Sequence, residues 1–173
     1  MERLEIYDAR LLIAIQQLFK NKYLDKFFKN YTHLGDAGAI WIVLGLAFMS
    51  FKQTRRSGIL MIAALITTWL FSSYILKTSL KRVRPYEKHK EVRLLIRTQK
   101  DTSFPSGHAA SSIACATVVM ITAGGGIGIL CLVLALLMAF SRVYVGVHYP
   151  LDVIVGSLLG FIIAALICLI FYL

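Results

Sequence analysis

The sequence predicts an all-α integral membrane protein, built as a bundle of about five transmembrane helices. Of its 173 residues, 58% are hydrophobic and only 16% are charged, and its mean hydropathy is +0.71. The apolar residues gather in runs that carry few charges, with glycine-rich or cationic segments between them. Such runs cross a bilayer as helices, because a helix satisfies its own backbone hydrogen bonds in lipid.

The expected spans lie between residue 34 and the C-terminus. They cover residues 34–51, 58–80, 106–123, 129–141 and 150–173. Trp41, near the start of the first span, is expected to be an interfacial anchor. The glycines at 124–128 predict a compact turn, since no strand precedes them as a nucleotide-binding loop requires. The odd number of cysteines, all in apolar runs, argues against disulfides or a zinc site: Cys115, Cys131 and Cys168.

The N-terminal residues 1–33 differ from the rest of the chain. Apolar side chains recur there at helical spacing, for example Leu11, Leu12 and Ile15, but lysines interrupt every run. This pattern predicts an amphipathic helical segment in the plane of the membrane interface, with packing against the side of the bundle as an open alternative. The start does not resemble a signal peptide, so the first span is expected to direct its own insertion. We expect one domain over 1–173, with residues 34–173 forming the bundle.

The formal net charge of +10 restricts the partners of this chain. In a soluble protein it would indicate nucleic acid, but in a membrane protein it favours anionic lipid, as headgroup surface or as substrate. Many cations lie in the loop 81–104, whereas Lys52, Arg55 and Arg56 lie on the opposite side of the bundle. The positive-inside rule would put that loop in the cytoplasm, but cations recruited to bind phosphate distort such a count.

Three short motifs stand at the ends of apolar runs. They are Lys77 followed after six residues by Arg84-Pro85, then Phe104-Pro105-Ser106-Gly107-His108, then Ser141-Arg142 followed after five residues by His148 and after three more by Asp152. Because successive spans cross in alternate directions, all three motifs are expected on one face of the bundle. They occupy residues 77–85, 105–108 and 141–152.

These residue types fit phosphoryl transfer, which needs neutralised phosphate oxygens, a nucleophile and a proton for the leaving oxygen. Arg84 and Arg142 offer planar forks of donors, and Lys77 offers a point charge. Ser106 is placed to cap a helix whose N-terminal N–H groups attract an anion, and Gly107 allows close backbone approach.

Two histidines are candidates for the chemistry. His148 and Asp152 stand four residues apart where a helix begins, so their side chains are expected to share a face, with the carboxylate fixing the tautomer of a nucleophilic imidazole. His108 is the candidate general acid. With one carboxylate among so many cations, the motifs do not predict a metal site. His33 and His89 lie outside the motifs and are interpreted as surface residues.

The three motifs, in this order and spacing, resemble the signature of the type 2 phosphatidic-acid phosphatase superfamily. That superfamily includes lipid phosphatases, bacterial polyprenyl-pyrophosphate phosphatases and vanadium haloperoxidases. The resemblance implies a helical core shared with acid phosphatases and haloperoxidases, and a two-step reaction without metal or cofactor. It implies a phosphohistidine on His148, assisted by Asp152, with His108 protonating the leaving group. The implied phosphate-binding residues are Lys77, Arg84, Ser106, Gly107 and Arg142.

The expected function is therefore that of an integral membrane lipid phosphatase. Its candidate substrates are undecaprenyl pyrophosphate, which is slightly preferred, lipid A 1-phosphate, phosphatidylglycerophosphate and phosphatidate. No nucleic-acid partner is expected, and nothing indicates the oligomeric state. In small bacterial relatives the site usually faces outward, which implies a multi-pass protein of the cell membrane with an extracytoplasmic site. The alternatives are a vanadium-dependent haloperoxidase, a non-catalytic binder or transporter of anionic lipid and, less favoured, a serine hydrolase using Ser106.

Overall fold

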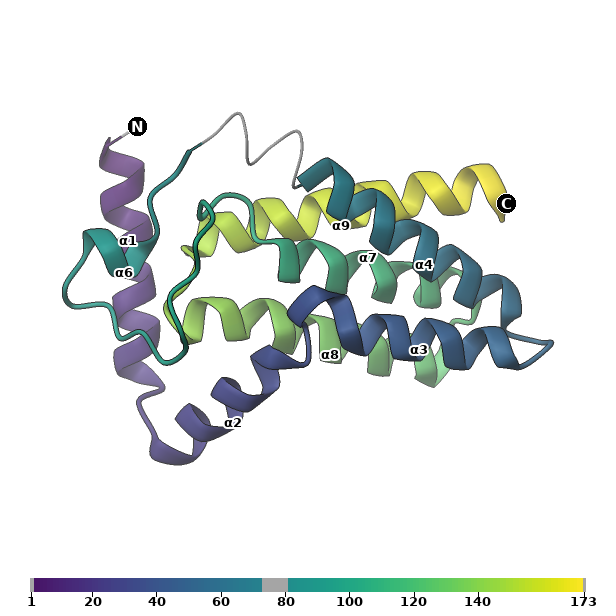
Figure 1. Cartoon of the computed structure of the whole chain (residues 1–173), viewed down its shortest axis with the longest axis horizontal. Helices are drawn as coiled ribbons and strands as arrows, with labels where there is room; N and C mark the ends of the chain where they lie inside the picture. Colours follow the sequence, from purple (N-terminus) through teal and green to yellow (C-terminus); the bar gives the residue numbers. More distant parts are fainter. Residues whose placement is uncertain (1, 73–80, 173) are drawn as a thin grey trace.

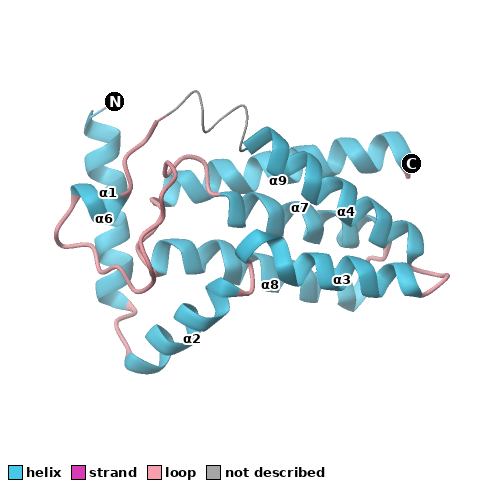
Figure 2. Ribbon diagram, in the orientation of Figure 1, coloured by secondary structure: helices cyan, strands magenta, loops and turns pink. Residues whose placement is uncertain are grey.

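The computed structural model describes residues 2–72 and 81–172, and every regular element within these ranges is helical (Figure 2). The all-α prediction is confirmed. The elements are α1 Glu2–Leu18, α2 Lys22–His33, the 3₁₀ turn η1 Asp36–Gly38, α3 Ala39–Ser50, α4 Arg55–Leu70, the short α6 Pro85–Lys88, α7 Gly107–Thr122, α8 Gly125–Tyr144 and α9 Pro150–Phe171.

Helices α3, α4, α7, α8 and α9 run side by side, and α1 lies crosswise at one end of this bundle (Figure 1). Helix α7 is central, because it packs against α4, α8 and α9 and is buried over most of its length. The connection from α6 to α7 lies at the end that α1 crosses (Figure 1). The chain segments that carry the described motif residues therefore meet at one end of the bundle.

Two glycines set the close contact between α7 and α9. A Cβ atom on Gly160 would lie 2.0 Å from the carbonyl oxygen of Ala110, and one on Gly156 would lie 2.5 Å from that of Ser106. Small residues at four-residue spacing let the backbones of two helices touch. The same contact holds the start of α7 against the start of α9, where the Ser106 amide donates to the Asp152 carbonyl at 3.0 Å.

The apolar helices are those of a membrane protein. In the described part of the chain, α8 and α9 are each long and apolar enough to cross a bilayer, and α2 with Asp36–Ser50 meets the same criterion only as a pair bent by 55°. Helix α7 is apolar, but its 16 residues reach only about 24 Å, against about 30 Å of hydrocarbon. The count of about five spans stays a prediction. The far end of the expected second span, with Lys77, lies outside the described residues.

The N-terminal segment forms two amphipathic helices separated at residues 19–21. Helix α1 buries Leu12 and Gln16 and exposes Leu4 and Leu11. Helix α2 begins at a cap, where the Asn21 side chain accepts a hydrogen bond from the Tyr23 amide at 2.8 Å. The crosswise orientation of α1 is the one expected of a helix in the interface plane, and its inner face also packs on α8 and α9.

Two details of the predicted spans need correction. Trp41 is only 1% exposed and faces the bundle, where its indole N–H donates to Ser112 Oγ at 2.8 Å. Because its N–H group is already hydrogen-bonded inside the bundle, this indole does not act as an anchor at the membrane–water interface. The predicted glycine turn at 124–128 is shorter than expected, because α8 already begins at Gly125; the turn uses Gly124 and Gly125, which both have positive φ, of 57° and 53°. Gly128 instead provides close packing, since a Cβ atom there would lie 3.0 Å from the Met120 Cα. The three cysteines are all buried.

Candidate active site

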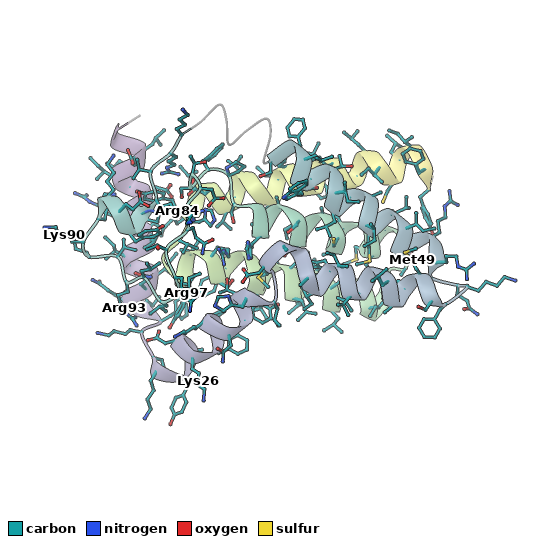
Figure 3. All side chains as sticks on the ribbon, in the orientation of Figure 1. Lys26, Met49, Arg84, Lys90, Arg93 and Arg97 are labelled. Atoms are coloured by element: carbon teal, nitrogen blue, oxygen red, sulfur yellow. The ribbon has the colours of Figure 1, made fainter. Side chains whose placement is uncertain are left out.

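A cavity of about 430 Å³ has one polar and one apolar wall. Its polar wall contains the predicted residues Arg84, Gly107, His108, Arg142 and His148. Its apolar wall comes from α3 and α4 and includes Ile42, Leu65, Ile66 and Trp69. Figure 3 shows Arg84 at the end of the bundle nearest α1, and Met49 at the opposite end. The polar wall of the cavity thus belongs to the end of the bundle where α1 and the long loop lie.

The other predicted site residues are placed differently. Ser106 is fully buried as the N-cap of α7, with its Oγ accepting from the Ala109 amide at 3.5 Å, and it is not among the lining residues. Asp152 lies behind His148 and is also fully buried. Lys77 is outside the described residues. The catalytic and phosphate-binding roles of all eight residues stay predictions.

Arg84 is held by backbone and side-chain acceptors from two segments. Its Nη1 donates to the Val147 carbonyl at 2.8 Å, and its Nε donates to the Asp101 carbonyl at 2.9 Å. Its Nη2 forms an ion pair with Asp101 Oδ1 at 2.5 Å. Pro85 follows at the first position of α6, where a helix accepts proline without losing a hydrogen bond. The guanidinium is therefore fixed next to the chain that carries His148.

Arg142 lies in the last turn of α8 and is only 2% exposed. Its Nη1 donates to Thr32 Oγ1 on α2, while its Nε has no hydrogen-bond partner among the described residues. A buried charged donor without a partner costs free energy. An anionic ligand in the cavity that Arg142 lines would supply the missing acceptor.

His148 directly precedes Tyr149, the N-cap of α9, and Asp152 is the third residue of that helix. The prediction that His148 and Asp152 share a helix face is therefore wrong, because His148 lies outside the helix. The two side chains are nevertheless close: His148 Nδ1 is 3.7 Å from Asp152 Oδ2. That oxygen accepts the Tyr149 amide at 3.0 Å. The imidazole and the carboxylate need to move only slightly closer to form a hydrogen bond.

Burial lowers the pKa of the His148 imidazole to about 3; Asp152 opposes the shift, and Arg84 and Arg142 add to it. The ring is then neutral over the whole physiological range, as a nucleophile requires. We expect ¹⁵N-histidine NMR in detergent to show neutral His148 from pH 7 down to pH 5, with the signal assigned by its loss in His148→Asn. A midpoint near the ordinary histidine value of about 6.5 would contradict this.

Asp152 is held by a buried chain of charges that the sequence did not predict. Arg82 Nη1 pairs with Asp152 Oδ1 at 2.5 Å, and Arg82 Nη2 pairs with Asp8 Oδ2 at 2.7 Å. Asp8, on α1, also accepts the Leu151 amide at 3.0 Å, and Ser103 Oγ donates to Asp152 Oδ2 at 2.5 Å. Burial lowers the pKa of Arg82, but Asp152 and Asp8 outweigh it and raise the value. Through Asp8, helix α1 is thus connected to Asp152, the carboxylate that lies beside the candidate nucleophile His148.

His108 has a carboxylate partner of its own, which the sequence also did not predict. Its Nε2 lies 3.1 Å from Asp36 Oδ1, and the other oxygen of Asp36 lies 2.8 Å from His33 Nδ1. His33 is exposed as predicted, but it is not isolated. His89 is only half-buried and packs edge-on against Tyr149, with ring centroids 6.1 Å apart.

The helical bundle and this cavity define a membrane protein with a cationic site, suited to phosphate, that contains two histidines. Residues 57–173 match the family model described as the PAP2 superfamily. The chain belongs to that superfamily.

Its relatives include named phosphatases. The chain is 33% identical over 138 residues to the undecaprenyl-diphosphatase of Sulfolobus acidocaldarius, covering 80% of this chain and 63% of that protein. Among solved structures, LpxE of Aquifex aeolicus superposes with a TM-score of 0.78 and 30% identity over 90% of this chain and 92% of that one. The transmembrane PAP2-type phosphatidylglycerolphosphate phosphatase of Bacillus subtilis gives a TM-score of 0.75 and 25% identity, over 96% and 85% of the two chains.

Proposed function

We propose that this protein is an integral membrane phosphatase that hydrolyses a phosphate monoester or diphosphate of a membrane lipid. The observation that carries the proposal is the cavity itself, which joins two arginines and two histidines on one wall to an apolar wall on the other. A phosphate bound at the arginines would leave its lipid tail beside α3 and α4. Neither a soluble phosphate ester nor a neutral lipid would use both walls.

The reaction begins with attack of neutral His148 on phosphorus. Its Nδ1 lies on the Asp152 side, so Nε2 forms the new N–P bond while the P–O bond to the lipid breaks. His108 donates a proton to the leaving oxygen, and Arg84 and Arg142 neutralise the phosphoryl oxygens in the transition state. Water then attacks the phosphohistidine and gives a proton to His108, which releases phosphate and restores both histidines. No step requires a metal or cofactor.

Undecaprenyl diphosphate is the preferred candidate substrate. A relative that carries this activity in its name aligns with 80% of the chain, and the apolar wall accepts a long prenyl tail. Lipid A 1-phosphate, phosphatidylglycerophosphate and phosphatidate present phosphate at the same depth and are the other candidates. All four fit a multi-pass protein of the cell membrane with an outward-facing site.

The test is phosphate release by the purified protein in detergent with EDTA present. Undecaprenyl diphosphate, lipid A 1-phosphate, phosphatidylglycerophosphate and phosphatidate are compared at equal mole fraction in the micelle. We expect release that is insensitive to EDTA, with the highest kcat/KM for undecaprenyl diphosphate. A higher kcat/KM for another of the four lipids would change the proposed substrate, but the protein would still be a membrane lipid phosphatase. Binding without release from any of the four would instead support an anionic-lipid binder.

A further inference from the structure

Asp36 links two histidines at the bend between α2 and α3. One carboxylate oxygen is 3.1 Å from His108 Nε2, and the other is 2.8 Å from His33 Nδ1. The bend is shaped for this contact. A Cβ atom on Gly35 would lie 2.7 Å from Cδ2 of His108, so the glycine lets the imidazole ring rest against the backbone. Ala37 and Gly38 both adopt positive φ, of 52° and 73°, which turns the chain sharply around Asp36.

The surroundings of His108 make a carboxylate partner necessary. Among the described residues, the other charged or titratable groups that line the cavity are Arg84, Asp101, Arg142 and His148. Two of these are cations, which disfavour a protonated imidazole. Asp101 is engaged in its ion pair with Arg84 at 2.5 Å. Among the described residues, Asp36 provides a carboxylate within hydrogen-bond distance of His108.

We infer that Asp36 is a positioning residue for the general acid: it binds Nε2 of His108, favours the protonated ring and leaves the Nδ1 proton for the leaving oxygen. This inference rests on the proposed phosphatase activity. In the first step the Nδ1 proton moves to the leaving oxygen as the P–O bond breaks. His108 then keeps its Nε2 proton on Asp36 and accepts a proton from the attacking water at Nδ1. Asp36 remains a carboxylate throughout.

The two histidine–aspartate pairs would then have different roles: His148 with Asp152 attacks phosphorus, and His108 with Asp36 protonates the leaving oxygen. Asp152 stands 3.7 Å from His148, which is buried and neutral before attack. Asp36 is half-exposed and closer to its histidine, at 3.1 Å. Because one histidine must lack a proton and the other must hold one in the same cationic cavity, different environments for the two rings are what catalysis requires.

The test compares two phosphates that share a dodecyl tail and differ in leaving group. Dodecyl phosphate expels an alkoxide and needs a proton, whereas 4-dodecyl-2-nitrophenyl phosphate expels a stable phenolate and does not. We expect Asp36→Asn to lower kcat/KM about 100-fold for dodecyl phosphate and less than about 5-fold for the nitrophenyl ester. In a His108→Gln background the same change should add little, because Asp36 acts through His108.

The matched control is Asp25→Asn, which removes another α2-region carboxylate, paired with Arg93 at 2.5 Å and Tyr144 at 2.7 Å. It should affect both substrates equally. Equal losses for Asp36→Asn on the two substrates, or no loss on either, would overturn the inference and leave Asp36 a structural residue. A parent protein that hydrolyses neither ester nor any lipid phosphate would instead overturn the proposed function, and the inference with it.

Discussion

His148→Ala is expected to reduce phosphate release on the order of 10⁴-fold, because the covalent route disappears with its nucleophile. The imidazole is 3% exposed, lines the cavity, and stands beside the fixed guanidinium of Arg84. His108 also lines the cavity, but it serves as the proton donor in the proposed reaction. The measurement is kcat for the best lipid substrate in detergent, beside the parent protein.

Two further variants separate loss of the nucleophile from loss of the fold. His148→Gly leaves a space in which added imidazole should restore part of the turnover, since free imidazole replaces the missing side chain. His89→Gln changes a histidine that does not line the cavity and should keep most activity. Rapid acid-free quenching of the parent should trap phosphate on the protein in an acid-labile, alkali-stable bond. If His148→Ala kept a tenth of the parental rate, the nucleophile would have to be another group.

The cavity-lining motif residues could be predicted from sequence because spacing along apolar runs carries three-dimensional information. Runs that cross in alternate directions bring their corresponding ends together. Arg84, His108 and the pair Arg142 and His148 come from three separate motifs, yet all four residues line one cavity. Only the positions of the run ends were needed for this result, and helix packing details were not.

The supporting residues could not be predicted in the same way. Asp8 reaches Arg82 only because α1 lies crosswise at the bundle end, and Asp36 reaches His108 only because the chain bends by 55° there. Neither angle is encoded in local periodicity. One signal was present: Asp8 stands four residues before buried Leu12, so it is a carboxylate on the buried face of an amphipathic helix. Such a group requires a buried cation.

Replacing that cation gives the second large expected effect. Arg82→Met leaves Asp8 and Asp152 as neighbouring buried carboxylates, 4% and 0% exposed, without their shared partner. Breaking a buried ion pair in this way costs about 3–5 kcal/mol, which should appear as a lower thermal midpoint in detergent. Turnover should fall about 1,000-fold in the folded fraction, because the carboxylate that orients His148 loses its strongest anchor.

The double variant Asp8→Asn/Arg82→Met distinguishes stability from catalysis. With Asp8 neutral and Arg82 replaced, Asp152 is the one charge left of the three residues Asp8, Arg82 and Asp152. It still accepts hydrogen bonds from Ser103 Oγ at 2.5 Å and from the Tyr149 amide at 3.0 Å. Most of the thermal midpoint should therefore return, while turnover should stay low because Arg82 no longer fixes Asp152. Parental turnover in the double variant would mean that Ser103 and the helix N-terminus suffice to orient Asp152. The contact from α1 would then stabilise the fold without contributing to the chemistry.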